Sequence, residues 1–273
     1  MNATAIVSHL FKARSPYPLY RRLTNFISWQ LFRKNAGKPW TFRLPDGALM
    51  SVRRGENGAT IFYYYGYPDY EEMMFVKKTL QPGDLFVDVG ANSGGWSLTS
   101  YGLGARSIAI EPVTSSFKRL TYNFDLNKTD KLKAVCVGVS DRDGELFFTT
   151  DADAGNRVAD SAEGATEKVK VTTLDNLLSN ESPALMKIDV EGHELNVLRG
   201  ATRVLENPSL RALVIETFRW ANYNTENLQQ IEKLLASKDF RPVGYDPENE
   251  KIYDLKPSEG GQNTIYLRGS FKL

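Results

Sequence analysis

The chain has 273 residues, of which 41% are hydrophobic and 25% charged, and its formal net charge is +1. This balance is typical of a globular protein with one domain plus an extension, and no apolar run approaches the roughly 20 residues that cross a bilayer. The single cysteine, Cys136, excludes an internal disulfide and a cysteine-rich zinc site. Because the N-terminus also lacks the apolar core of a signal peptide, we expect a cytoplasmic protein.

The first 54 residues carry ten basic side chains against Asp46 alone, a net charge of +9, whereas the remainder has 24 basic against 32 acidic residues, or −8. A helix is predicted between Pro18 and Gly37. Such a basic amphipathic helix suits an anionic membrane or another polyanion. We favour packing of its apolar stripe on the main domain or on a second subunit, with peripheral membrane contact as the alternative. The stripe consists of Leu19, Leu23, Phe26, Ile27 and Leu31.

A β-hairpin is predicted over residues 40–53, followed by an aromatic run at 62–67 and a helix at 69–80. From residue 85 onward, apolar runs and helical patterns alternate, which indicates a parallel sheet with helices on both faces. We therefore expect an α/β, doubly wound, Rossmann-like sheet over 61–273, preceded by a basic helix and hairpin extension over 1–60. Strands are predicted at 85–90, 107–111, 132–139, 184–189 and 210–216, and helices at 95–103, 115–127, 194–205 and 226–237. Residues 145–149 and 168–172 form an added hairpin, and 241–245, 251–255 and 264–268 complete the sheet.

The strongest functional signal is the sequence DLFVDVGANSGG at residues 84–95. A buried strand here runs into a glycine-rich turn, where the absence of side chains lets a cofactor approach the backbone. A dinucleotide fingerprint requires glycine at the position that Asn92 occupies. The next predicted strand ends in Glu111 and Pro112, and a carboxylate at that tip suits two ribose hydroxyls. Glu111 therefore supports binding of a cofactor that contains a nucleoside. It does not distinguish a dinucleotide from another cofactor of this kind.

The turn resembles motif I of class I S-adenosylmethionine (SAM) methyltransferases. From residue 63 to residue 216 the chain closely resembles the FkbM family of methyltransferases. The matching segments are Tyr70-Glu71-Glu72, Asp88-Val89-Gly90-Ala91-Asn92, Glu111-Pro112, Thr173-Leu174-Asp175, and KIDVEGHELNVLRGA at residues 187–201.

This resemblance implies a SAM-dependent O-methyltransferase with a class I fold, acting on a hydroxyl of a sugar, a glycan or a glycosylated natural product. It does not cover the basic N-terminal segment or the extreme C-terminus. The residues expected to bind SAM are Asp88, Gly90, Ala91, Asn92, Ser93, Gly94, Glu111, Pro112, Ser140 and Asp189.

Charged residues gather at the end of the fourth strand, where open α/β sheets place their ligands. Methyl transfer requires alignment of the acceptor oxygen and removal of its proton, and Asp189, Glu191 or His193 could accept that proton. Lys187 is more suited to pairing with one of these acids than to acting as a base. Glu216 ends the fifth strand, and with Asp189 and Glu191 it could bind Mg²⁺ through carboxylate oxygens.

Aromatic side chains are expected to form a lid over the cofactor and the walls of an acceptor site, because tyrosine and tryptophan stack on sugars. Ordinary core packing is the competing interpretation for each of them. The candidate substrate residues are Tyr64, Tyr65, Tyr70, Glu72 and Trp220.

Several other functions fit less well. The chain has no Pro-Pro pair after the fourth strand, which argues against base N-methylation, and Cys136 lies in an apolar run, which argues against a nucleophilic cytosine enzyme. We therefore expect no nucleic-acid partner. The alternatives that stay open are an inactive SAM-binding interaction subunit and an NAD-dependent oxidoreductase.

Overall fold

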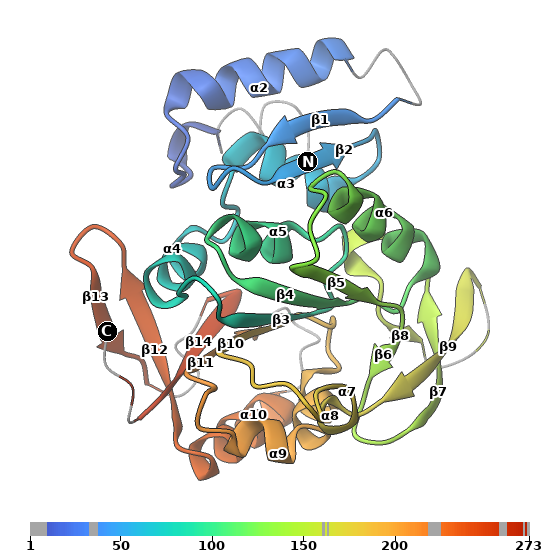
Figure 1. Cartoon of the computed structure of the whole chain (residues 1–273), viewed down its shortest axis with the longest axis vertical. Coiled ribbons are helices and arrows are strands. Elements are labelled where there is room, and N and C mark those ends of the chain that lie inside the picture. The colour runs from blue at the N-terminus through green and yellow to red at the C-terminus, as the bar shows by residue number, and fades with distance from the viewer. Residues whose placement is uncertain are drawn as a thin grey trace.

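The computed structural model describes residues 10–32, 38–159, 162, 164–217, 225–256, 261–269 and 271. Its centre is an eight-stranded sheet in the order β13-β12-β14-β11-β10-β3-β4-β5 (Figure 1). Five strands are parallel: β3 (Leu85–Val89), β4 (Arg106–Ile110), β5 (Leu132–Val135), β10 (Leu185–Ile188) and β11 (Ala212–Glu216). Three antiparallel strands complete one edge: β12 (Phe240–Asp246), β13 (Lys251–Asp254) and β14 (Asn263–Arg268).

Helices cover both faces of this sheet, and each face has its own hydrophobic cluster (Figure 1). Because both faces are covered, β3, β10 and β11 are buried along their whole length. The doubly wound α/β fold predicted from the sequence is therefore confirmed. One face carries α4 (Tyr70–Thr79), α5 (Gly95–Gly102) and α6 (Thr114–Asp125), and the other carries α7 (Leu174–Leu177), α8 (Glu194–Arg199), α9 (Thr202–Glu206) and α10 (Thr225–Ser237).

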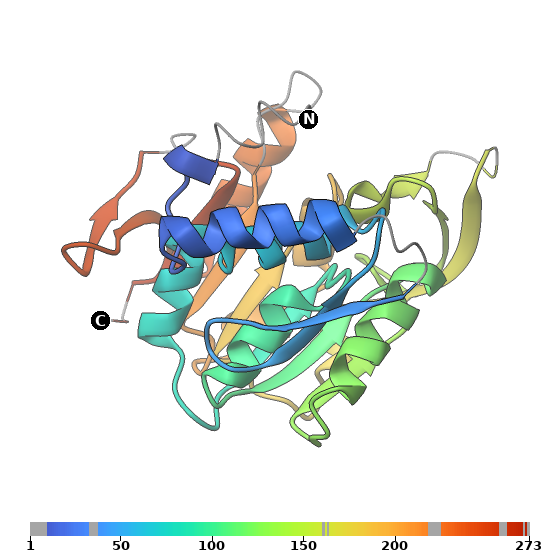
Figure 2. The same ribbon diagram turned by 90° about the horizontal axis from the view of Figure 1, so that it is seen from above.

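The N-terminal segment forms α2 (Leu19–Phe32), a hairpin of β1 (Trp40–Arg43) and β2 (Leu49–Val52), and α3 (Asn57–Tyr65). Figure 2 shows α2 lying across the top of the molecule. Its inner face packs on α3, with 6.0 Å between the ring centroids of Trp29 and Tyr63. The hydrophobic cluster under α2 continues into the face of the main sheet. The boundary at residue 60 stays a prediction.

A second sheet, in the order β6-β9-β7-β8, flanks the main one. The predicted hairpin is present as the antiparallel pair β7 (Gly144–Thr149) and β9 (Thr166–Thr172). Between them lie the short helix η1 (Asp153–Gly155) and β8 (Val158–Ala159).

Two predicted elements are divided in the structure. The strand expected at 132–139 is two strands, because β5 pairs with β4 while β6 (Gly138–Val139) crosses to the second sheet. The helix expected at 194–205 is two helices, because α8 ends at Arg199 and α9 begins at Thr202. At the break, a Cβ on Gly200 would lie 2.1 Å from the backbone oxygen of Ser140, so the chain passes there too closely for any side chain.

Candidate active site

Several buried polar residues line a cavity at the carboxyl ends of β3 and β10. These neighbouring strands are the point at which the chain changes direction across the sheet, since β4 and β5 follow β3 on one side and β10 begins the other side. Open α/β sheets bind their ligands at such a switch point. The cavity therefore lies where the fold itself predicts a ligand.

The turn after β3 is shaped by close contact with β10. Gly90 has a φ of 82°, and a Cβ there would lie 1.8 Å from the backbone oxygen of Asp189. The amides of Gly90 and Ala91 both donate to the carbonyl oxygen of Ile110 on β4, at 2.9 and 3.1 Å. These contacts hold the turn between its two neighbouring strands and leave its backbone open toward the cavity.

Asp88 lines the cavity, but both groups that donate to it in the structure belong to α5. Its Oδ2 accepts hydrogen bonds from the backbone amide and the hydroxyl of Ser97, at 3.1 and 2.7 Å. Burial raises the pKa of Asp88 to about 6, because the Ser97 hydrogen bonds and the charge of Lys187 offset only part of the desolvation. Asp88 thus fixes the first turn of α5 under the cavity.

Glu111 directly follows β4, and its side chain lies at the cavity wall. Its two oxygens accept hydrogen bonds from the backbone amides of Asn92 and Val113, at 2.8 and 2.9 Å. Burial raises its pKa to about 7. Since each carboxylate oxygen can accept more than one hydrogen bond, Glu111 keeps acceptor capacity toward the cavity.

Residues far away in the sequence cover this turn. Phe62 of α3 lies over Gly95, where an added Cβ would come within 2.3 Å of its ring. From the second sheet, the backbone oxygen of Asp153 accepts a hydrogen bond from the side chain of Asn92 at 3.3 Å. Phe148 lines the same wall. Phe62 belongs to the aromatic run at 62–67 that was expected to form a lid over the cofactor. The sequence analysis missed Phe148 and Asp153, because nothing near the glycine-rich turn indicates which distant segments will fold over it.

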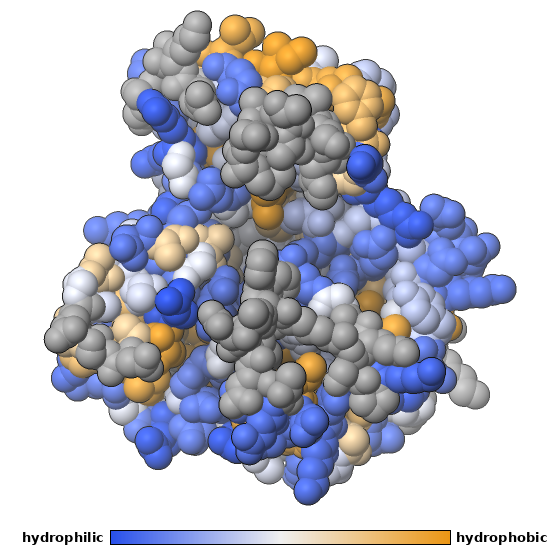
Figure 3. Space-filling view, turned by 180° about the vertical axis from the view of Figure 1, so that it is seen from behind, coloured by the Kyte–Doolittle hydropathy of each residue, from blue (hydrophilic) through white to orange (hydrophobic). Residues whose placement is uncertain are grey.

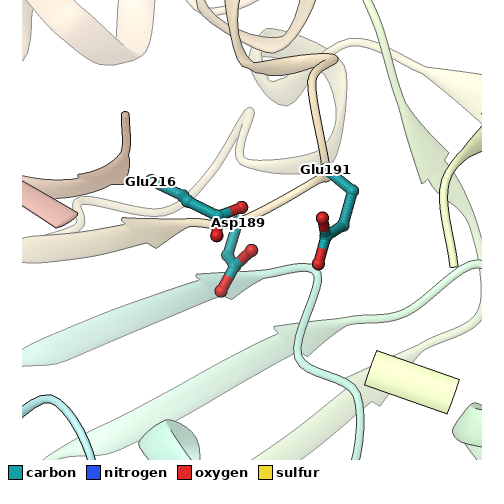
Figure 4. Close-up of side chains that lie close together, drawn as sticks. All are labelled: Asp189, Glu191 and Glu216. Atoms are coloured by element: carbon teal, nitrogen blue, oxygen red, sulfur yellow. The ribbon is translucent and has the colours of Figure 1, made fainter. Parts of the chain in front are cut away.

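Three acids converge on the opposite side of the cavity, and we call them the carboxylate cluster: Asp189, Glu191 and Glu216 (Figure 4). One oxygen of each lies within 4.8 Å of the others. Lys187, whose side chain is 1% exposed, holds Asp189 through a 2.9 Å ion pair and donates to Asn263 at the same distance. One lysine therefore neutralises only part of the negative charge of the cluster.

The cluster holds a proton at neutral pH. Burial and the charge of Asp189 raise the pKa of Glu216 to about 9, and Glu216 is hydrogen-bonded to Asp189. The pKa of Asp189 stays below its usual value despite burial, because Lys187 stabilises the ionised form. Asp189 is thus the ionised member of the pair and Glu216 the protonated one.

Glu191 occupies a strained position in the turn between β10 and α8. Its φ is 53°, a left-handed conformation that is unusual for a residue other than glycine. The carboxylate of Glu194 accepts hydrogen bonds from the backbone amides of Val190 and Gly192, at 3.2 and 3.0 Å, and these bonds fix the turn. Burial and the neighbouring charge of Asp189 raise the pKa of Glu191 to about 7.

Asp69 and Trp96 form the wall beside Lys187, and neither was singled out from the sequence. The indole nitrogen of Trp96 donates to Asp69 at 3.2 Å, and the ammonium of Lys187 lies 5.6 Å from the centroid of the Trp96 ring. Burial raises the pKa of Asp69 although Lys187 opposes the shift. The sequence offered one signal for Asp69, which follows Pro68 and lies at the start of a predicted helix, where aspartate is common.

The structure separates the other candidate residues. His193 and Ser140 are 3.0 Å apart and hydrogen-bonded, but neither belongs to the cavity lining. Burial lowers the pKa of His193. Gly94 is likewise outside that lining. The sequence-predicted residues that do line the cavity are Asp88, Gly90, Ala91, Asn92, Ser93, Glu111, Pro112, Lys187, Asp189, Glu191 and Glu216.

The candidate substrate residues lie farther from the cluster. Tyr64 packs on Phe26 of α2 with 5.8 Å between ring centroids, and Tyr65 is buried in the same hydrophobic cluster. Tyr70 is half-buried against that cluster. Glu72 lines a second cavity, which shares Asn263 with the first. Trp220 lies outside the described residues.

The fold and the site define a class of protein: an α/β enzyme domain with a cofactor-type turn and a partly buried carboxylate cluster at its switch point. Residues 88–242, more than half of the chain, match the family model of the methyltransferase FkbM domain. The chain therefore belongs to the FkbM methyltransferase family, as its motifs predicted.

The chain is similar to the hexuronic acid methyltransferase AglP of Haloferax volcanii, with 30% identity over 136 residues. The alignment covers 49% of this chain and 55% of that protein, so the chain spans about half the length of this curated relative.

The chain also has similarity to two solved structures. A precorrin-6Y C5,15-methyltransferase from Geobacter metallireducens has 13% identity and a TM-score of 0.46, with 84% of this chain and 100% of that chain covered. A SAM-dependent methyltransferase from Agrobacterium tumefaciens has 10% identity and a TM-score of 0.45, with 86% and 71% covered.

Proposed function

We propose that this protein is a SAM-dependent O-methyltransferase that acts on a hydroxyl of a sugar, either in a glycan or in a glycosylated natural product. The observation that carries the proposal is the carboxylate cluster facing a cofactor-type turn across one cavity. Residues suited to a nucleoside cofactor and residues suited to accepting a proton thus line the same cavity. Membership of a methyltransferase family supports this assignment.

The residues around the turn fit the proposed cofactor. Glu111 offers carboxylate oxygens to ribose hydroxyls, and the open backbone from Gly90 to Ser93 offers room for the amino-acid end of the molecule. Asp189 and Asp69 offer negative charge to its amino group. When bound, SAM supplies a methyl group on a positively charged sulfur, which is already activated for displacement.

Transfer to an alcohol forms an oxygen–carbon bond, breaks a sulfur–carbon bond and releases the proton of the hydroxyl. Glu191 is the proposed acceptor of that proton, because a base is most effective when its pKa is near the working pH and that of Glu191 is about 7. Asp189 and Glu216 are the proposed groups that orient the hydroxyl. Lys187 is the proposed positioning residue for Asp189, to which it is ion-paired.

The acceptor is proposed to be a sugar because the relative AglP is a hexuronic acid methyltransferase and because Lys187, Gln262 and Asn263 line the cavity together with the carboxylate cluster. Carboxylates and amides are suited to hydroxyls held in fixed directions. Glu72 and Asn263, in the second cavity, are proposed to contact the part of the acceptor that does not react.

We propose that Mg²⁺ binds the carboxylate cluster as a second feature of the site. Three carboxylate oxygens within 4.8 Å of one another suit a hard cation. Lys187 pairs with Oδ2 of Asp189, and Glu216 is hydrogen-bonded to the same carboxylate, so an ion would replace that hydrogen bond. Cation binding would displace the proton that Glu216 holds, since its pKa is about 9.

Calorimetric titration with SAM, S-adenosylhomocysteine and NADH, with and without Mg²⁺, tests the cofactor and the metal together. Binding of S-adenosylhomocysteine is the expected result. Binding of NADH alone would replace the proposal with an oxidoreductase. For Mg²⁺, repeating the titration at neutral pH in buffers with different ionisation enthalpies measures proton release, and no heat in any buffer would refute the metal proposal.

Methyl transfer is then measured from radiolabelled SAM to a panel of neutral, amino and uronic sugars, free and nucleotide-linked. We expect product with at least one sugar. A protein that binds SAM but transfers no methyl group to any acceptor would instead be an interaction subunit.

A further inference from the structure

The outer face of α2 carries an apolar stripe that the fold does not use. Tyr20, Ile27 and Leu31 have exposed fractions of 70%, 56% and 65%. With Thr24, these residues follow the spacing of one helical face, and we call the four residues the outer stripe. Figure 3 shows apolar surface gathered at the top of the molecule, where α2 lies. Phe11, just before the helix, is 56% exposed as well.

The opposite face of α2 fixes this orientation. Trp29 is buried against Tyr63, and the side chain of Asn25 donates to the carbonyl oxygen of Tyr63 at 2.7 Å. Arg22 is buried and donates to the carbonyl oxygen of Ala13 at 2.7 Å. The sequence-predicted stripe is therefore divided: Leu23 and Phe26 pack inward, whereas Ile27 and Leu31 face outward. Since folding needs only the inner face, the outer stripe is available to another surface.

Positive charge accompanies the outer stripe. Lys12, Arg21 and Lys38, which flank or belong to the helix, are exposed. The only acid among residues 1–54 is Asp46, and its side chain is 5% exposed and ion-paired with Lys77 at 2.8 Å. The described surface contributed by this segment therefore presents positive charge without negative charge. In the sequence, residues 1–54 carry a net charge of +9 and the remainder carries −8.

We propose that α2 binds the surface of an anionic lipid bilayer, lying parallel to it with the outer stripe in the headgroup region. Apolar side chains flanked by lysine and arginine are the features of interfacial helices. The separation of charge orients the molecule, because an anionic surface attracts the extension and repels the rest. The proposal is independent of the methyl transfer reaction.

A second copy of the chain is a poorer occupant of this stripe. A 14-residue helix is about 21 Å long, and one narrow stripe on it offers much less than the roughly 800 Å² per partner of a standard interface. Pairing two such helices would also bring together two segments that each carry +9. An anionic membrane meets both the apolar and the electrostatic features at once.

Flotation of the full chain with lipid vesicles tests this proposal. One set contains phosphatidylcholine alone, and the other an equal mixture of phosphatidylcholine and phosphatidylglycerol. We expect binding to the anionic vesicles, little binding to the neutral ones, and partial release at high salt, because salt screens the electrostatic part of the attraction.

The variant Ile27→Glu/Leu31→Glu changes only exposed side chains, so circular dichroism should match the unmodified chain. We expect its partition onto anionic vesicles to fall about tenfold or more. Tyr253→Glu is the matched control, because Tyr253 is 53% exposed but belongs to β13, and it should bind as the unmodified chain does. Lys12→Glu/Lys38→Glu should reduce binding and its dependence on salt.

Two results would overturn the proposal. One is the absence of binding to anionic vesicles at low salt, or equal binding by the chain and the Ile27→Glu/Leu31→Glu variant. The other is a concentration-dependent dimer in light scattering that this variant abolishes, which would make a second copy the occupant of the outer stripe.

Discussion

Glu216 and Asp189, at the ends of the neighbouring strands β11 and β10, form a hydrogen-bonded pair that shares one proton. Glu216 is buried and Asp189 is half-buried, and Lys187 supplies one positive charge to Asp189. The pKa of Glu216 rises to about 9 because burial and the negative charge of Asp189 both disfavour its ionised form. Protonation of Glu216 therefore contributes to stability as well as to the chemistry of the site.

The first prediction concerns stability at alkaline pH. Because the folded pKa of Glu216 is about 9 and the unfolded value is about 4.3, the folded state binds more protons between these values, and stability falls as pH rises through that window. Glu216→Gln stays neutral and removes this loss. We expect its melting temperature to exceed that of the unmodified chain by about 5 °C at pH 9.5 and by much less at pH 5.

Calorimetric melting of both proteins from pH 5 to pH 9.5 measures the effect. Glu206→Gln serves as the control, since Glu206 is 60% exposed and pairs with Lys238 at the surface. Parallel pH profiles for the chain and Glu216→Gln would mean that Glu216 is ionised in the folded state.

The second prediction concerns the proposed base. Glu191→Gln keeps the size of the side chain but cannot accept a proton, so kcat should fall about 10²- to 10⁴-fold while SAM affinity changes little. In the unmodified enzyme, kcat should rise with pH through about 7, because Glu191 must be ionised to act. The kcat of the variant should not show this rise, which we call the acidic limb of the pH profile.

The pH profile separates catalysis from structure. A purely structural role for Glu191 would lower kcat by a similar factor at every pH and leave the limb in place. Glu181→Gln, in which a surface ion pair with Arg106 is lost, should keep both the rate and the profile.

The third prediction concerns the cofactor. Glu111→Gln places an amide NH₂ group against a backbone amide of Asn92 or Val113, and removes the negative charge at the proposed ribose site. We expect affinity for S-adenosylhomocysteine to fall about 10- to 100-fold, measured by calorimetry. Glu145→Gln, on the surface of the second sheet, is the control and should bind normally. Unchanged affinity in Glu111→Gln would remove Glu111 from the cofactor site.

The central strands could be predicted from the sequence because their signal is local. Residues 85–87 and 212–215 are continuous apolar runs, and such runs are typical of parallel strands covered on both faces. Strands that alternate with helices run parallel, so the carboxyl ends of β3, β10 and β11 lie at the same end of the sheet. This arrangement brings Asp88, Asp189 and Glu216 together.

The walls of the site could not be predicted in the same way. Helix α3 contains three consecutive tyrosines, which are weak helix formers, and it is stabilised by burial of its aromatic residues under α2. The contact between Asn92 and Asp153 joins residues 61 positions apart, and no local pattern predicts it. The divided stripe of α2 has the same cause, since tertiary packing decides which part of an apolar surface faces inward.

The fourth prediction tests the contact that shapes the cofactor turn. Gly90→Ala adds a Cβ that would lie 1.8 Å from the backbone oxygen of Asp189, at a φ of 82° that alanine also disfavours. The overlap is with backbone of a neighbouring strand, so relief requires separating β3 from β10 at the centre of the sheet. We expect a loss of more than about 4 kcal/mol in the free energy of unfolding, or failure to fold.

Gly83→Ala separates this overlap from backbone strain alone. Gly83 has a similar φ of 89°, but an added Cβ meets no atom within 4 Å. Its cost should be about 1 kcal/mol, which is the strain of the left-handed conformation without a clash. Urea unfolding of the three proteins compares these values directly. Equal destabilisation by the two variants would mean that strand β10 yields at Asp189, and that the close contact does not set the shape of the turn.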